Sequence, residues 1–384
     1  MKRIYLDHAA TTPARPEAIA AMLPLLDAGG YNPSSIHAEG RAARAALDAA
    51  RNDVARVLGA KPREIVFTGG GSESINLAVL GAARAAAARG RHVVTSVAEH
   101  HAVLHAVDML ERDGWEVTRL AVDANGCVPA AEFAAALRPQ TTLASLMSAN
   151  NEIGTVASIA ELARIARRAG VVFHTDAVQA AALLPLDVDE LGVDLLSISG
   201  HKFYGPKGAG ALYIRSGTPI EAQIVGGGQE YGRRAGTENV AGIAGMATAL
   251  VLAQAERAAA AARIGALRDR LEAGICAAVH DVQVNAAGAP RLAGISSIAF
   301  AAVSAEQLLI CLDLAGIAAS AGSACAAGSL EPSHVIAALG LPPAYRAGVI
   351  RFSLGQATTS AQIERVLTII PQIVAHLRRA AVVV

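Results

Sequence analysis

Short apolar runs alternate with longer amphipathic segments along the first two thirds of the chain. The apolar runs are typical of buried strands and occur at residues 64–67, 92–95, 115–120, 142–147, 171–175 and 193–198. The amphipathic segments have the apolar spacing of helices and occupy residues 17–22, 38–58, 74–88, 101–112 and 159–169. This alternation predicts an α/β domain. Strands that are apolar throughout predict a largely parallel sheet with helices on both faces.

The pattern changes in the last third of the chain. A glycine-rich loop precedes an alanine-rich helix, which is predicted over about residues 240–271. Further segments predict a smaller α+β domain and lie at residues 295–300, 305–314 and 350–354. We therefore expect two domains: a large one of residues 13–256, and a small one that combines residues 257–384 with the extended arm 1–12.

Composition and charge exclude several classes of partner. The formal net charge of the 384-residue chain is zero, so electrostatics favour neither nucleic acid nor an anionic membrane. The longest apolar segment, residues 241–255, is shorter than the roughly 20 residues that span a bilayer, and no signal-peptide core is expected at the start. Four widely spaced cysteines without a CxxC pair suit a reducing cytosol, so we expect a cytoplasmic protein without disulfides or a zinc site.

Lysine is scarce in this chain, and one glycine-rich loop after the strand at residues 193–198 holds two lysines. Lysine and arginine together number 33, but the lysines are only Lys2, Lys61, Lys202 and Lys207. An amine that must lose its proton to form a Schiff base cannot be replaced by a guanidinium that stays charged. The pattern therefore predicts a nucleophilic lysine at Lys202. A solvated loop lysine is the alternative, chiefly for Lys207.

Polar residues follow several predicted strands, at the end where open α/β sheets bind ligands. The turn 68–72, Thr-Gly-Gly-Gly-Ser, offers backbone N–H groups and a hydroxyl for a single phosphate. Asp176 could pair with a pyridinium nitrogen, and Gln179 could reach a ring hydroxyl. His100 could stack on a flat cofactor or shuttle protons. The alternatives are an ordinary glycine turn capped by Ser72, an N-cap aspartate and a satisfied polar histidine.

Three further positions are candidates for binding or nucleophilic chemistry. One asparagine of the polar segment 149–154 could bind a carboxylate or a ring oxygen. Arg351 lies inside an apolar strand, where a guanidinium either binds an anion or forms a buried ion pair. Cys325 is flanked by small residues, as expected of a reactive thiol, although an incidental free cysteine would have the same pattern.

Several sequence strings occur in the order in which a known family has them. They are Tyr5-Leu6-Asp7 with Ala10-Thr11-Thr12-Pro13, Asn150-Asn151-Glu152-Ile153-Gly154, Ser199-Gly200-His201-Lys202, Arg234-Ala235-Gly236-Thr237-Glu238-Asn239, and Gly322-Ser323-Ala324-Cys325 through Leu330-Glu331-Pro332-Ser333-His334. With them the chain resembles, over nearly its whole length, the cysteine desulfurases of the NifS/IscS type. The resemblance implies an α/β fold of the fold-type I pyridoxal-phosphate class and membership of the class V aminotransferases.

The resemblance also implies pyridoxal 5'-phosphate as the cofactor, with a role for each candidate residue. Lys202 would form the Schiff base and move protons, and Thr237 would reach the phosphate of the partner subunit of a homodimer. The other cofactor contacts would be stacking by His100, pairing of Asp176 with the pyridine nitrogen, contacts of Gln179 and Asn151, and phosphate binding by Gly71, Ser72, Ser199 and His201.

The implied reaction takes sulfur from L-cysteine. Asn151 and Arg351 would bind the substrate carboxylate, and Cys325 of the small domain would take the sulfur as a persulfide and free L-alanine. The sulfur would pass to acceptor proteins such as an iron–sulfur scaffold, for cluster assembly or other thiolation. No resident metal is implied, although Cys325 could be a transient iron–sulfur ligand. Ser72 and the pair after Cys325 depart from the family, which commonly has Thr and Thr-Ser there, and His334 receives no role.

Two kinds of alternative stay open. A selenocysteine lyase or a related small-amino-acid aminotransferase would use the same lysine and aspartate, but an aminotransferase needs no thiol. A non-catalytic scaffold of the same fold would only bind sulfur-transfer partners. That scaffold would not require Lys202, Asp176 and Cys325 together.

Overall fold

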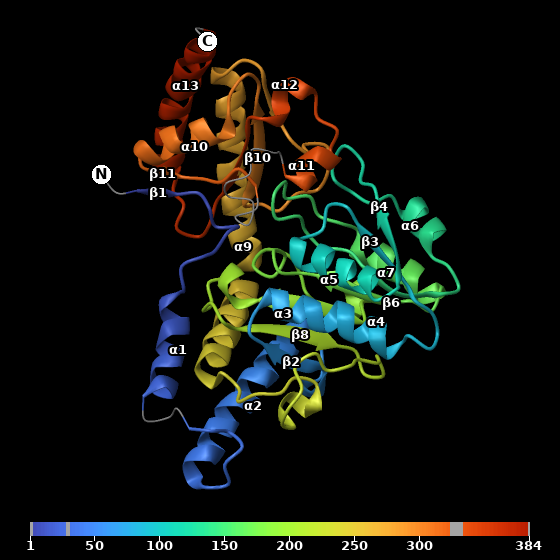
Figure 1. The fold of residues 1–384 in the computed structure, drawn as a ribbon. Helices are drawn as coiled ribbons and strands as arrows, with labels where there is room; N and C mark the ends of the chain where they lie inside the picture. Colours follow the sequence, from blue (N-terminus) through green and yellow to red (C-terminus); the bar gives the residue numbers. More distant parts are fainter. Residues whose placement is uncertain (1–2, 28–30, 323–332, 383–384) are drawn as a thin grey trace.

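A seven-stranded sheet forms the centre of the larger part of the molecule. The computed structural model describes residues 3–27, 31–322 and 333–382. The strands are β2 (Ile65–Thr68), β3 (His92–Ser96), β4 (Glu116–Leu120), β5 (Thr141–Ser145), β6 (Val172–Asp176), β7 (Leu195–Ser199) and β8 (Gly210–Ile214). They lie in the order β2-β8-β7-β6-β5-β3-β4 (Figure 1). β3 to β7 are parallel, whereas β8 is antiparallel to both of its neighbours.

The pattern of apolar runs predicts this sheet closely. Every predicted strand is present, with bounds that differ by no more than two residues. The pattern misses β8, because this short strand begins with Gly210 directly after a glycine-rich loop. Val93 and Val94 of β3 belong to two different apolar cores, one on each face of the sheet. The prediction that helices cover both faces is therefore confirmed.

The helices around the sheet are α2 (Ala38–Leu58), α5 (His101–Arg112), α6 (Ala130–Ala136), α7 (Ile159–Arg168) and α8 (Val188–Leu191). The helix predicted over residues 74–88 is wrong in its bounds. α3 (Gly71–Asn76) begins at the glycine turn, a π-helical turn (Leu77–Gly81) follows, and α4 (Ala82–Ala85) ends the run. The cap before α3 is Gly70, so Ser72 is not an N-cap. This early start leaves the N–H groups of the turn for a ligand.

One long helix joins the two parts of the chain. α9 (Val240–Ala278) continues beyond its predicted end at residue 271 and runs beside α1 (Pro16–Leu26) and α2 (Figure 1). Its apolar residues up to Ala253 belong to the core of the sheet, and those from Ile264 belong to a second core. The domain boundary near residue 257 stays a prediction, which this change of core along α9 supports.

The second core is built from α+β structure, as predicted. An antiparallel sheet has the order β12-β10-β9, with β9 (Val282–Val284), β10 (Ile295–Phe300) and β12 (Val349–Ser353). The helices of this part are α10 (Ala305–Leu314), α11 (His334–Ala338), α12 (Pro343–Arg346) and α13 (Ser360–Val382). Of these, α10 and α13 supply apolar residues to the same core as β10 and β12.

The N-terminal arm crosses from the second core to the large sheet. β1 (Ile4–Tyr5) pairs in parallel with β11 (Ile317–Ala318), and the hydroxyl of Thr12 then donates to the carbonyl oxygen of His201. The arm thus lies against the loop that follows β7. None of the helices in the described part of the chain has the length and apolar content that crossing a bilayer demands.

Candidate active site

A cavity of about 260 Å³ opens at the carboxyl ends of the central strands. Its lining comes from the N-terminal arm, from the loops after the parallel strands and from β12. Nearly all of the residues predicted from the sequence line it, namely Gly71, Ser72, His100, Asn151, Asp176, Gln179, Ser199, His201, Lys202 and Arg351. Because parallel strands end at the same edge of a sheet, folding brings these distant positions together.

The candidate phosphate turn lies against the loop of Lys202. A Cβ built on Gly71 would lie 2.9 Å from Cγ2 of Val178 and 3.3 Å from Cβ of Ser199, so only glycine fits without a shift. Ser199 ends β7, and His201 and Lys202 follow in a 3-10 turn (Gly200–Lys202). N–H groups, hydroxyls and a nearby lysine therefore meet at one end of the cavity, which is a donor set suited to a phosphate.

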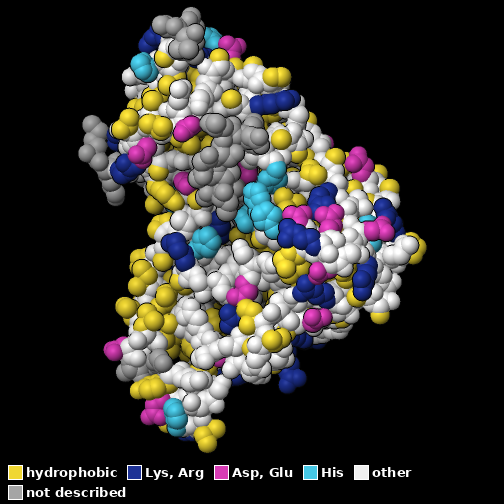
Figure 2. Space-filling view, viewed as in Figure 1, with side chains coloured by type: hydrophobic (Ala, Val, Ile, Leu, Met, Phe, Trp, Pro, Cys, Tyr) yellow, Lys and Arg dark blue, Asp and Glu magenta, His cyan; other side chains and the backbone are white. Residues whose placement is uncertain are grey.

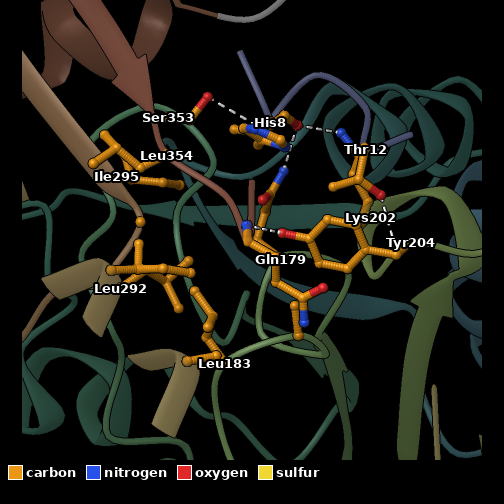
Figure 3. Close-up of a pocket in the computed structure, with 16 residues that line it drawn as sticks. His8, Thr12, Gln179, Leu183, Lys202, Tyr204, Leu292, Ile295, Ser353 and Leu354 are labelled. Atoms are coloured by element: carbon orange, nitrogen blue, oxygen red, sulfur yellow. Dashed lines mark hydrogen bonds between the residues drawn. The ribbon is translucent and has the colours of Figure 1, made fainter. Parts of the chain in front are cut away.

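The amine of Lys202 is held by the N-terminal arm. Its Nζ donates to the carbonyl oxygens of Ala9, at 2.5 Å, and Ala10, at 3.0 Å. Nε2 of Gln179 donates to the same oxygen of Ala9 at 3.0 Å. Figure 3 shows Lys202 and Gln179 beside a second cavity of about 40 Å³, which also contacts His8. Backbone carbonyls carry no sequence signal, so sequence reasoning missed this part of the site.

Asp176 is a fully buried carboxyl at the end of β6. It accepts a hydrogen bond from the N–H of Val178 at 2.9 Å, and no helix begins there, so the N-cap alternative is wrong. Burial raises the pKa of Asp176 to about 6, against the opposing effects of the Val178 N–H and the charge of Lys202. A cationic partner in the cavity would stabilise the ionised form of this carboxyl.

The histidines of the cavity are neutral near pH 7. Burial, reinforced by the charge of Lys202, lowers the pKa of His100 to about 4, and the same two causes lower the pKa of His201 to about 4. Nδ1 of His100 accepts from the N–H of Ala102 at 3.1 Å, which leaves the proton on Nε2. A neutral imidazole suits stacking on an aromatic ring better than ion pairing.

The contacts of Arg351 agree with both roles that its sequence context allows, a buried ion pair and the binding of an anion. One nitrogen, Nη2, pairs with Oδ1 of Asp7 at 2.8 Å, and Nη1 donates to the carbonyl oxygen of Asn151 at 2.8 Å. Within the described part of the chain, the buried Nε has no hydrogen-bond partner. The guanidinium is therefore oriented by a structural ion pair and still lines the cavity, where it can receive a carboxylate.

One predicted residue does not line the cavity, and another falls outside the described residues. Thr237 is exposed on the surface of the chain and does not line the cavity. Cys325 falls outside the described residues, so its assigned role stays a prediction. Among the described residues, no cluster of three or more histidine, cysteine, aspartate or glutamate side chains could hold a metal ion.

Comparison with known proteins identifies the family. The aminotransferase class-V family matches residues 4–366, so the chain belongs to this family. Cysteine desulfurase IscS of Dictyoglomus turgidum is 49% identical over 379 residues, covering 98% of this chain and 96% of the relative. Cysteine desulfurase of Klebsiella pneumoniae is 45% identical over 379 residues, with 98% and 94% covered.

Solved structures agree with this assignment. A NifS-like protein superposes with a TM-score of 0.91 at 34% identity, covering 98% of this chain and 100% of that one. SspA in complex with cysteine has a TM-score of 0.81 at 35% identity, with 93% and 100% covered. The fold is therefore that of the fold-type I pyridoxal-phosphate enzymes, and pyridoxal 5'-phosphate is the cofactor of this family.

The cavity fits that cofactor on three independent observations. The buried carboxyl of Asp176 would gain a cationic partner from a protonated ring nitrogen. The lack of a Cβ at Gly71 lets the turn pack closely against Ser199, which brings backbone N–H groups and a hydroxyl together for a phosphate. Lys202 reaches the same cavity and, among the described residues, is the only one that brings a side-chain amine to its lining. The ring nitrogen, the phosphate and the aldehyde of the cofactor thus each have a chemically matched group in the cavity.

Replacing Glu99 by glutamine is expected to flatten the pH dependence of stability. Burial is the main cause that raises the pKa of Glu99 to about 8; the N–H of Met147 opposes it and the charge of Asp176 adds to it. The pKa of Glu99 is higher in the folded than in the unfolded chain. The stability that this shift contributes is therefore complete below about pH 4 and is lost as the pH rises through about 8.

The free energy of unfolding of the unmodified chain should therefore fall from about pH 5 to about pH 8 relative to that of Glu99→Gln. Each unit of difference between the folded and the unfolded pKa of Glu99 corresponds to about 1.4 kcal/mol. Urea unfolding at several pH values measures the difference, with the exposed Glu132→Gln as the matched control. Parallel curves for the unmodified chain and Glu99→Gln would contradict the assigned pKa.

Proposed function

We propose that the protein is a pyridoxal-phosphate-dependent cysteine desulfurase. It converts L-cysteine to L-alanine and takes the sulfur on Cys325 as a persulfide for transfer to acceptors. The observation that carries the proposal is the common cavity of Lys202, Asp176 and Arg351, which offers an amine and a buried carboxyl to the cofactor and a carboxylate-binding guanidinium to a small amino acid. The cysteine desulfurase relatives and the SspA structure with cysteine support the choice of substrate.

The residues of the cavity divide into cofactor and substrate contacts. Asp176 would hold the ring nitrogen, Gln179 and Asn151 the ring oxygen, and His100 a ring face. Gly71, Ser72, Ser199 and His201 would hold the phosphate. When bound, the cofactor supplies an electron sink that weakens the bonds to the Cα of the substrate.

The chain's own residues then orient the substrate and move its protons. Arg351 and Asn151 fix the carboxylate, and the amine of Lys202 accepts the proton of the substrate Cα. The thiolate of Cys325 bonds to the substrate sulfur while the carbon–sulfur bond breaks. The carbon keeps the electron pair and gains a proton, so alanine leaves and Cys325 carries the persulfide. Atoms and electrons balance without an outside oxidant.

A homodimer forms part of the proposal. Thr237 is exposed in the single chain, where it could serve the phosphate site of a partner subunit. Large apolar side chains are exposed along α1 and on nearby loops, and Figure 2 shows apolar residues gathered on that side. They include Leu23 and Leu26 of α1 and Ile36 of the segment between α1 and α2. Such a surface favours burial against a second subunit. The proposed setting is the cytoplasm, with acceptors such as an iron–sulfur scaffold.

Incubation of the purified enzyme with L-cysteine and a thiol reductant tests the activity. The expected products are L-alanine and sulfide in equal amounts. Pyruvate or amination of the cofactor would instead support an aminotransferase, and turnover of selenocysteine alone would support a selenocysteine lyase. A protein without a Schiff-base absorption band would support the non-catalytic scaffold.

A further inference from the structure

A carboxylate lies beside the candidate phosphate turn. Glu73 follows Ser72 directly, and its Oε2 accepts a hydrogen bond from the backbone N–H of Gly69 at 2.8 Å. A Cβ built on Gly69 would also lie 2.8 Å from that oxygen, so the carboxylate packs against the backbone of the turn. An uncompensated negative charge in this position would repel a phosphate bound by the turn.

Arg234 neutralises this carboxylate through two contacts. Its Nε donates to Oε1 of Glu73 at 2.8 Å, and its Nη2 donates to Oε2 at 3.2 Å. Paired contacts of this kind are the geometry in which a guanidinium orients a carboxylate most strongly. The side chains of Arg234 and Glu73 are only 21% and 25% exposed, so solvent screens the pair less than an ion pair on the open surface. Arg234 therefore fixes the carboxylate with Oε2 directed at Gly69.

The loop that carries Arg234 is itself held against β2, the strand that leads into the turn. Glu230, four positions before Arg234, is buried and accepts two hydrogen bonds from Arg51, at 2.6 and 2.8 Å. It also accepts the N–H of Phe67 in β2 at 2.9 Å. Glu230 and Tyr231 have φ angles of +47° and +61°, which non-glycine residues keep only where surrounding contacts hold them. Arg234 thus has a fixed place relative to the turn.

We propose that Glu73 and Arg234 are positioning residues for the phosphate of the cofactor. This inference rests on the proposed function in one respect, the assignment of the phosphate to the turn that contains Gly71 and Ser72. Glu73 holds the N–H of Gly69 and so sets how the turn enters the cavity. Arg234 orients that carboxylate and compensates its charge, so the phosphate meets N–H groups and hydroxyls without an opposing charge. Neither Glu73 nor Arg234 lines the cavity, so both act through the turn.

Replacing Arg234 by alanine in the holoenzyme tests the proposal. Equilibrium dialysis against a series of pyridoxal 5'-phosphate concentrations gives the concentration that half-saturates the Schiff-base absorption band. This concentration should rise by about tenfold to a hundredfold, the scale expected when a hydrogen bond between charged groups is lost. Arg234→Lys keeps the charge without the paired contacts, so its half-saturation concentration should rise less than that of Arg234→Ala. Arg270→Ala removes a pair of the same geometry, with Glu364, and is the matched control that should leave the half-saturation concentration unchanged.

A substitution at Glu73 tests whether charge is the cause. Glu73→Gln alone should raise the half-saturation concentration by less than about threefold, because the amide oxygen can still accept a hydrogen bond from Gly69. Combined with Arg234→Ala, Glu73→Gln should lower the half-saturation concentration below that of Arg234→Ala alone, because the uncompensated carboxylate is then gone. A purely structural role would leave the double variant as weak as Arg234→Ala or weaker.

Pyridoxal, which lacks the phosphate, separates an effect on the phosphate from general damage to the site. Arg234→Ala should bind pyridoxal as the unmodified enzyme does. An equal loss of affinity for pyridoxal and for pyridoxal 5'-phosphate would overturn the proposal. So would an unchanged half-saturation concentration in Arg234→Ala, or a double variant that binds the cofactor no better than Arg234→Ala.

Alanine formation from L-cysteine by the unmodified enzyme is measured alongside. If the variants lose the cofactor as expected but the unmodified enzyme forms no alanine, the proposed reaction fails while the role of Glu73 and Arg234 stands. If alanine forms and Arg234→Ala keeps its affinity for pyridoxal 5'-phosphate, only the role of Glu73 and Arg234 fails.

Discussion

Replacing Lys202 by arginine is expected to remove the Schiff-base absorption band and to lower alanine formation by about a thousandfold or more. Arginine keeps the positive charge and can still donate to the carbonyl oxygens of Ala9 and Ala10. It cannot form a Schiff base or accept a proton, because the guanidinium stays protonated. The substitution thus separates the chemistry of the amine from its charge.

Absorption spectra and alanine assays measure this effect. Lys207→Arg is the matched control, since Lys207 lies in the same loop but is exposed and does not line the cavity. It should change kcat by less than about twofold, as expected of surface substitutions. A Lys202→Arg enzyme that kept the absorption band would contradict the assignment of the Schiff base to Lys202.

Replacing Cys325 by serine is expected to abolish sulfide release while the absorption band stays. A hydroxyl does not accept sulfur from the substrate, whereas Lys202 and the cofactor contacts are unchanged. Sulfide release in the presence of a reductant and mass spectrometry of the sulfur-loaded protein measure the loss. Equal sulfide output from Cys325→Ser would refute the persulfide step.

Cys276→Ser is the control for that experiment. Cys276 is exposed, and partial burial of its thiol together with the charge of Glu272 raises its pKa. A thiol with a raised pKa is largely protonated near neutral pH and is a poor nucleophile. Its replacement should leave sulfide release unchanged, so any loss in Cys325→Ser belongs to Cys325 and not to thiols in general.

The seven-stranded sheet could be predicted well because most of its strands carry a simple signal. Parallel strands such as β3 and β7 are buried at every position, and each carries adjacent apolar residues that mark it in the sequence. The pattern did not reveal β8, nor the π-helical turn between α3 and α4. Both depend on what packs against them, since neither a short strand beginning with Gly210 nor a wider helical turn has its own periodicity.

The side chains of the site were also predictable, because they follow strands whose ends meet. Asp176 ends β6 and Lys202 follows β7, and these two strands pair in parallel, so the proximity of the two side chains follows from the order of the strands. The partners that hold these side chains were not predictable. The carbonyl oxygens of Ala9 and Ala10 belong to backbone that every residue has, and Asp7 and Arg351 pair across 344 positions of sequence.

The sequence by itself determined which groups are available for chemistry. The amine of Lys202, the carboxyl of Asp176 and the thiol of Cys325 follow from the identities of these residues, which folding does not alter. Only the tertiary structure decided how the described groups are held: which pKa values burial shifts, which carbonyls receive the amine of Lys202, and which carboxylate orients Arg351. These properties arise from contacts between segments far apart in the chain, and local sequence patterns do not encode such contacts.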